Sequence, residues 1–148
     1  LELQAAMGRV QLRKAKKIKE ARKKNFDYLY KHLSGFGDLC MPQWVDGADV
    51  CWFAFPITIW SNKRPQLLAH LEKNGIETRP LFAGQIHKHP AYKDSKYRIS
   101  GKLEHSAGIL ENSFWISVHP RNTKADNDRI IKTFDDFFTS SNTHSSDK

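Results

Sequence analysis

The sequence predicts an α+β domain that follows a long N-terminal helix. Apolar residues recur at helical spacing from residue 1 to about 34, and this helix is longer than a small domain needs for its own packing. Three stretches rich in aromatic and β-branched residues come next, with helical patterns between them. Short strands that alternate with helices predict a small, mainly antiparallel three-stranded sheet with its helices on one face.

The first helix has helix-forming residues from its start. Leu3, Met7 and Val10 form one apolar series, and a second series continues to Leu33, shortly before two glycines that end the helix. No N-capping residue precedes the pattern. We therefore expect a C-terminal fragment of a longer polypeptide, in which residues 1–34 link this domain to one upstream.

The remaining elements are predicted from periodicity and from turn residues. The segment 51–60 has strand composition, and its Pro56 favours an edge position or a bulge. A helix over about 64–74, which Gly75 ends, precedes a strand at 76–81. The pattern then predicts a helix, a strand and a last helix at about 103–111, 113–118 and 123–138. Residues 35–138 form the predicted domain, and the polar tail 139–148 is expected to be disordered.

Length and composition narrow the class of protein. The 148 residues suffice for one domain with a core, and 39% hydrophobic with 27% charged residues is typical of a soluble globular protein. No apolar run is long enough to span a membrane. Cys40 and Cys51 form neither a disulfide framework nor a metal-ligand set, so we expect a reducing cytoplasm.

The net charge of +8 comes from one segment of the chain. Nine basic residues and a single acidic one, Glu20, lie between Arg9 and Lys24, and the rest of the sequence is balanced. Such a basic helix could bind the phosphates of a nucleic acid. A solvated face, or a face toward an acidic partner, is the favoured interpretation, and a nucleic-acid-binding module stays an alternative.

Candidate binding residues are densest between Gly75 and Tyr92. There a helix-ending glycine leads into a short strand, and the strand leads into a polar loop of the kind that carries binding residues on a rigid scaffold. Arg79 can offer a planar fork to a phosphate or a carboxylate. From the residues alone, an ion pair of Arg79 with Glu77 or Glu72 is equally expected.

The other candidates complement this arginine. Gly84 allows a positive φ or a close backbone approach, and the amide of Gln85 suits a sugar hydroxyl because it both donates and accepts. Phe82 lies at the rim, and His87 follows in the same loop. His119 ends the third predicted strand and could face the same site, although a simple turn is the favoured interpretation. The histidine spacing matches no common zinc pattern, so no metal site is predicted.

The sequence lacks a complete catalytic set. Gly-x-Ser-x-Gly, Gly-x-x-x-x-Gly-Lys and Gly-x-Gly-x-x-Gly are all absent, and neither cysteine has an activating sequence context. We therefore expect no catalytic, cofactor-binding or metal-binding residue in this chain, and the loop is interpreted as half of a site.

Four blocks of the sequence resemble one enzyme family. They are Leu3–Leu12, Arg22–Phe26, Gly75–Gly84 and Asn112–Pro120. In this order they resemble the C-terminal part of the DegT/DnrJ/EryC1/StrS sugar aminotransferases, which have fold type I and depend on pyridoxal phosphate. Leu-Phe-Ala-Gly and Asn-Ser-Phe-Trp-Ile look most like the branch of 3-dehydrases that act on CDP-4-keto-6-deoxyglucose in lipopolysaccharide O-antigen synthesis.

This resemblance implies that the cofactor lies upstream of the chain. An upstream domain would carry a histidine in place of the Schiff-base lysine, and the cysteines of a [2Fe-2S] centre. The intact protein, a homodimer, would combine the pyridoxamine form of the cofactor with the 4-keto sugar, remove a proton and release the 3-hydroxyl. A reductase would supply electrons, and this fragment alone would be inactive.

The resemblance also assigns roles to residues of this chain. The segment around Arg79 would close over the nucleotide sugar, and the family branch has Asn where Gln85 stands. The expected binding residues, with the two histidines as weaker candidates, are Arg79, Phe82, Gly84, Gln85, His87 and His119. A sugar aminotransferase with an upstream lysine is the alternative within the family, and an inactive, truncated gene product is a further one.

Overall fold

The computed structural model describes residues 1–82 and 84–143. Four strands form one antiparallel sheet in the order β1-β2-β4-β3. The elements in chain order are α1 (Glu2–Leu33), β1 (Leu39–Cys40), β2 (Ala54–Ile59), α2 (Arg64–Lys73), β3 (Thr78–Pro80), two 3₁₀ turns η1 (Ile86–Lys88) and η2 (Pro90–Tyr92), α3 (Glu104–Asn112), β4 (Ser113–Ser117) and α4 (Lys124–Thr143).

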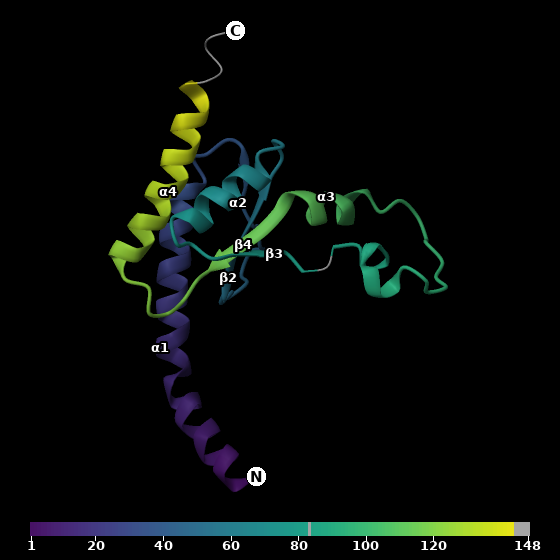
Figure 1. Ribbon diagram of the computed structural model, residues 1–148. Coiled ribbons are helices and arrows are strands. Elements are labelled where there is room, and N and C mark those ends of the chain that lie inside the picture. Colours follow the sequence, from purple (N-terminus) through teal and green to yellow (C-terminus); the bar gives the residue numbers. More distant parts are fainter. Residues whose placement is uncertain (83, 144–148) are drawn as a thin grey trace.

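The core lies between one face of the sheet and three helices. Phe55 of β2 is opposite Ile116 of β4, and Ile57 is opposite Phe114, so these four side chains share a face and are almost completely buried. Helices α1, α2 and α4 cover that face (Figure 1), while α3 continues directly into β4. The predicted α+β class is confirmed. The helical part of the core consists chiefly of Phe26, Leu29, Leu33, Leu67, Leu71, Ile130 and Phe134.

The sheet differs from the prediction in two respects. It has a fourth strand, β1, which pairs Leu39 with Ile59 and Cys40 with Thr58. With this strand in place, β2 is an inner strand, so the predicted edge position of Pro56 is wrong for the strand as a whole. The proline is tolerated because β1 spans only two residues and stops short of it, which leaves β4 as the only neighbour at Pro56.

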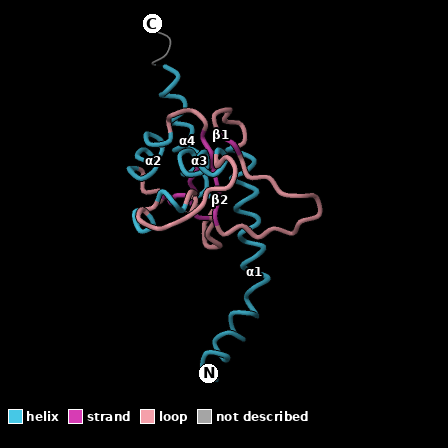
Figure 2. The backbone as a smooth tube through the Cα atoms, turned by 90° about the vertical axis from the view of Figure 1, so that its right-hand side faces the viewer, coloured by secondary structure: helices cyan, strands magenta, loops and turns pink. Residues whose placement is uncertain are grey.

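The N-terminal half of α1 projects from the body of the domain. Figures 1 and 2 show it extending away from the sheet in both views, and residues 1–17 are all exposed. Its apolar series therefore has no packing partner among the described residues: Leu3 is 77% exposed and Met7 63%. The basic residues from Arg9 to Lys24 lie largely on this projecting part, and Lys19 forms an ion pair with Asp49.

The last helix begins with a reciprocal cap. The Asp126 carboxylate accepts from the backbone N–H and the hydroxyl of Thr123, and the Asp126 N–H donates back to that hydroxyl. These bonds hold the pKa of Asp126 below its usual value. The helix continues to Thr143, so the predicted start of a disordered tail at residue 139 is wrong. The rest of that predicted tail lies outside the described residues.

Candidate functional site

The predicted loop starts from a helix end that fixes its direction. Gly75 adopts a φ of 72° after α2, and the N–H groups of Gly75 and Ile76 donate to the carbonyls of Glu72 and Leu71, both at 2.9 Å. Only glycine adopts this left-handed conformation without a steric penalty. The buried side chain of Ile76 then anchors the chain as it enters β3.

Arg79 lies on β3, one of the two edge strands of the sheet, opposite Trp115 of β4. Its guanidinium is exposed and forms an ion pair with Glu77, one of the two alternatives that the sequence left open. The other acid, Glu72, accepts instead from the Thr78 hydroxyl at 2.7 Å. An exposed pair of this kind contributes little to stability, so the guanidinium stays available to a stronger anion.

Two left-handed residues shape the loop after β3. Phe82 has a φ of 51° and a side chain that is 77% exposed, and Gly84 has a φ of 58°. A β-carbon at Gly84 would lie 2.5 Å from Cβ and 3.0 Å from Cα of Leu110, so this glycine is in direct contact with α3. A positive φ is uncommon for a bulky residue and carries backbone strain. The turn thus exposes the ring of Phe82 while the loop stays attached to α3.

Gln85 has a different environment from the one the sequence suggested. Its side chain is 6% exposed, and its amide nitrogen donates to the Leu103 carbonyl at 2.7 Å and to the Ser106 hydroxyl at 3.3 Å. The amide oxygen is buried and has no hydrogen-bond partner among the described residues. Gln85 therefore ties the loop to the start of α3, and its contact with a sugar hydroxyl stays a prediction.

His87 lies at the wall of an open pocket of about 500 Å³, a cavity that the chain between Ile86 and Leu103 lines. Its ring is 5.6 Å from the ring of Tyr97, centroid to centroid. The neighbouring Lys88 forms a 3.8 Å ion pair with Glu111 of α3. The segment 92–98, which the sequence analysis did not single out, interleaves aromatic and basic residues and supplies much of the cavity wall.

His119 lies at the opposite end of β4 from this loop. Pro80 pairs with Phe114, and His119 lies five residue steps beyond Phe114, roughly 17 Å of extended chain. The structure therefore brings Arg79 to His87 into one stretch along the sheet edge and α3 but does not bring His119 to it. The Nδ1 atom of His119 accepts from the Arg121 N–H at 3.2 Å, within its own turn.

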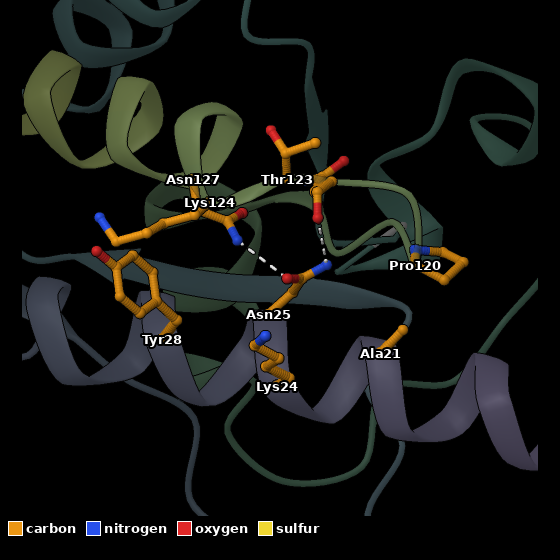
Figure 3. Close-up of a pocket in the computed structure, with 9 residues that line it drawn as sticks. Ala21, Lys24, Asn25, Tyr28, Pro120, Thr123, Lys124 and Asn127 are labelled. Atoms are coloured by element: carbon orange, nitrogen blue, oxygen red, sulfur yellow. Dashed lines mark hydrogen bonds between the residues drawn. The ribbon is translucent and has the colours of Figure 1, made fainter.

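That turn borders a second cavity, of about 370 Å³, between α1 and the start of α4. Figure 3 shows Asn25 of α1 pointing across to the turn. Its amide nitrogen donates to the carbonyls of His119 and Asn122, and its oxygen accepts from Asn127 at 3.1 Å. These bonds give the Arg22–Phe26 block a structural role, because they fix the end of β4 against α1.

We expect Asn25→Ala to destabilise the fold by about 1–3 kcal/mol, because it leaves buried polar groups of the turn and of Asn127 without a partner. Urea unfolding followed by circular dichroism measures this loss. Asn74→Ala is the matched control, since the Asn74 amide bonds only to the exposed His70 carbonyl, at 2.8 Å. Equal losses in the two variants would show that the network around Asn25 adds nothing.

The described residues do not by themselves form a cofactor cradle. No described lysine is buried, and Lys124, at the second cavity, bonds to Asp128 at 2.6 Å. That contact raises the pKa of Lys124, whereas a lysine that forms a Schiff base needs a lowered one. Nor do the described residues hold a group of three His, Cys, Asp or Glu side chains that could bind a metal.

The same fold, a long helix followed by this sheet and its helices, occurs in solved fold type I aminotransferases. The chain belongs to the DegT/DnrJ/EryC1/StrS aminotransferase family, whose sequence profile matches residues 1–135. All four blocks described above lie within the matched range, and so does the predicted loop.

Two curated relatives are similar over nearly the whole chain. The lipopolysaccharide biosynthesis protein RfbH of Salmonella typhimurium is 35% identical over 93% of this chain and 32% of its own length. The dTDP-4-dehydro-2,6-dideoxy-D-glucose 3-dehydratase of Saccharopolyspora spinosa is 35% identical over 95% of this chain and 31% of its own length. The chain thus spans about a third of the length of these relatives.

A solved structure extends this comparison to the fold. The GDP-4-keto-6-deoxy-D-mannose-3-dehydratase of E. coli, solved with bound hydrated PLP, superposes with a TM-score of 0.75 at 23% identity, over 86% of this chain and 33% of that one. The pyridoxal phosphate belongs to that solved protein, and the likeness to this chain concerns the fold. In the part of this chain that the structure describes, no helix combines the length and the apolarity needed to cross a bilayer.

Proposed function

We propose that this chain is the C-terminal part of a pyridoxal phosphate-dependent nucleotide-sugar 3-dehydratase. The observation that carries the proposal is 35% identity, over more than nine-tenths of the chain, both to a 3-dehydratase and to a lipopolysaccharide biosynthesis protein. The substrate class is a 4-keto-6-deoxyhexose on a nucleotide, CDP by the resemblance of the Leu81–Gly84 and Asn112–Ile116 motifs. The product serves the synthesis of lipopolysaccharide dideoxysugars.

In this proposal the chain binds and orients the sugar while the reaction centre lies elsewhere in a longer protein. The cofactor, which acts as an electron sink when bound, is held by an upstream domain. In the CDP-sugar branch that domain also carries a [2Fe-2S] centre, which a reductase supplies with electrons. Residues 1–34 link to that domain, and the exposed Leu3, Met7 and Val10 supply an apolar face for it. The enzyme is a cytoplasmic homodimer.

The residues of this chain have distinct tasks in the proposal. Arg79 leaves its exposed pair with Glu77 and donates a fork to the substrate's phosphate or a sugar oxygen. The exposed ring of Phe82 covers the sugar and excludes water. Gly84 keeps the turn against α3, so the two side chains hold their positions. His87 lines the adjoining cavity.

The reaction itself is tested with the full-length protein, pyridoxamine phosphate and a CDP-4-keto-6-deoxyhexose. We expect loss of the C3 oxygen in the product, measured by NMR and mass spectrometry. A 4-amino sugar instead would establish the alternative, an aminotransferase, which the solved aminotransferases of the same fold support. The upstream sequence also separates the two activities: the Schiff-base position holds a histidine in a 3-dehydratase and a lysine in an aminotransferase.

We expect Arg79→Ala to lower the affinity of the full-length protein for the nucleotide sugar about tenfold or more, because a charge-assisted bidentate contact is lost. Titration calorimetry measures the change. Arg121→Ala is the matched control, an exposed arginine at the far end of β4. Glu77→Gln removes the competing carboxylate and should keep or raise the affinity. Unchanged affinity in Arg79→Ala would leave this arginine as a surface ion pair only.

A further inference from the structure

We propose that α1 and the loop between β1 and β2 together bind the surface of a membrane that contains anionic phospholipids. This inference goes beyond the proposed function and does not depend on it, because neither segment belongs to the predicted sugar-binding loop. Two features support it: a row of exposed cations along α1 and an exposed tryptophan–valine pair beside that row. The N-terminal half of α1 is accessible, since it projects from the body of the domain in both views (Figures 1 and 2).

Six basic residues of α1 form one exposed side of the helix, which we call the basic face. At 3.6 residues per turn they lie within roughly 120° of the helix circumference and along roughly 22 Å of its length. This side is turned away from the buried Leu29 and Leu33, which pack into the core. None of the six forms an ion pair within the described residues, and Glu20 is the only acid along the row. The basic face consists of Arg9, Arg13, Lys16, Lys17, Lys23 and Lys24.

An apolar pair lies beside the basic face, on the loop between β1 and β2. Trp44 is 45% exposed and Val45 is 77% exposed. The ring of Trp44 packs edge-on against two aromatic rings of α1, and it lines a small cavity of about 80 Å³ together with Lys23. An ion pair between Asp49 and Lys19 joins the same loop to the helix. The apolar pair is therefore held next to the row of cations.

A lipid surface is the partner that uses both features at once. Anionic headgroups attract clustered Lys and Arg side chains, and tryptophan prefers the boundary between headgroups and acyl chains because its ring has an apolar body and a polar N–H. A duplex nucleic acid would neutralise the cations, but its phosphates and sugars would leave Trp44 and Val45 without an apolar partner.

The basic face also stays open when α1 contacts an upstream domain. The apolar series of Leu3, Met7 and Val10, which is proposed to face that domain, is centred roughly 100° away from the basic face on the helix circumference. One helix can therefore contact the upstream domain on one side and a membrane surface on another. A basic amphipathic helix is typical of proteins that bind at a membrane surface.

The test is flotation of the full-length protein with vesicles of phosphatidylcholine, either alone or with roughly one-third phosphatidylglycerol. We expect binding to the anionic vesicles only, with release as the salt concentration rises. Arg13→Gln combined with Lys16→Gln should weaken this binding about tenfold or more, because two cations leave the basic face while glutamine preserves the helix. Lys73→Gln combined with Lys93→Gln is the matched control, since it changes the net charge equally at exposed positions outside α1.

A second set of variants tests the apolar contact. Trp44→Ala should weaken vesicle binding severalfold, whereas Trp60→Ala, which removes another exposed tryptophan, should leave it unchanged. Val45→Ser repeats the test at a side chain that is 77% exposed, without removing a ring that packs on α1. Circular dichroism checks that each variant is folded.

The outcomes decide between a membrane surface and other polyanions. Absence of binding to the anionic vesicles at low salt, or equal losses in the two glutamine double variants, would overturn the inference. Tight binding of a duplex oligonucleotide, together with vesicle binding that Trp44→Ala and Val45→Ser leave unchanged, would mean that the basic face attracts any polyanion and would overturn it as well. Turnover of a nucleotide sugar should be the same in Arg13→Gln with Lys16→Gln as in the wild type, so this inference and the proposed function can fail separately.

Discussion

Gly84→Ala is expected to destabilise the protein by about 2–5 kcal/mol. Two effects add: a left-handed φ costs a residue with a β-carbon about 1–2 kcal/mol, and overpacking costs about 1–3 kcal/mol more. The new β-carbon would lie 2.5 Å from Cβ and 3.0 Å from Cα of Leu110, so the helix α3 itself must shift. Urea unfolding followed by circular dichroism measures the loss.

Gly101→Ala separates the two effects. Gly101 has a φ of 73°, similar to that of Gly84, but nothing lies within 4 Å of a β-carbon placed there. We therefore expect only the conformational cost, about 1–2 kcal/mol. If both variants lose the same stability, the contact between the loop and α3 is not tight. In the full-length protein, Gly84→Ala should also weaken nucleotide-sugar binding, because the turn that carries Phe82 is displaced.

Phe114→Ala is expected to lower the free energy of unfolding by about 3–5 kcal/mol, the usual loss when a buried aromatic ring is removed and an empty cavity is created in its place. Phe114 is completely buried at the centre of the sheet, where β4 pairs with β2 at Ile57 and with β3 at Pro80. A small domain has a total stability of about 5–15 kcal/mol, so this single change removes much of it. Thermal and urea unfolding both measure the effect.

Phe82→Ala is the control for that experiment. The ring of Phe82 is 77% exposed, so its removal should change the free energy of unfolding by no more than about 0.5 kcal/mol. In the full-length protein the same change should weaken nucleotide-sugar binding. The two phenylalanines thus have opposite expected profiles, and a large stability loss in Phe82→Ala would mean that its ring packs within the fold and does not face a ligand.

Most helices and strands could be predicted because their signals are local. The 3.6-residue periodicity gave α1, the aromatic and β-branched runs gave β2 and β4, and Gly75 marked the turn between α2 and β3. The strand β1 could not be predicted, since two residues are too few for a pattern. Its strand character comes from pairing with Thr58 and Ile59, which lie about twenty residues further along the chain.

The location of the candidate site stays a prediction, and the structure shows the surroundings of the residues proposed for it. The density of polar residues between Gly75 and Tyr92 marked the loop, and the structure places its candidate residues along β3 and α3. Whether a side chain faces out or in depends on distant partners. Gln85 turns inward because the Leu103 carbonyl and Ser106 lie within hydrogen-bonding reach, and no local pattern announces such partners.

The sequence by itself determined the order of the longer helices and strands, the family and the location of the excess charge on α1. These depend on neighbouring residues and on motifs that are continuous in the chain. Only the tertiary structure decided which residues meet, because antiparallel register and helix packing join segments far apart in sequence. That register places His119 at the opposite end of β4 from His87, and the packing brings Asn25 to Asn127 across 102 positions.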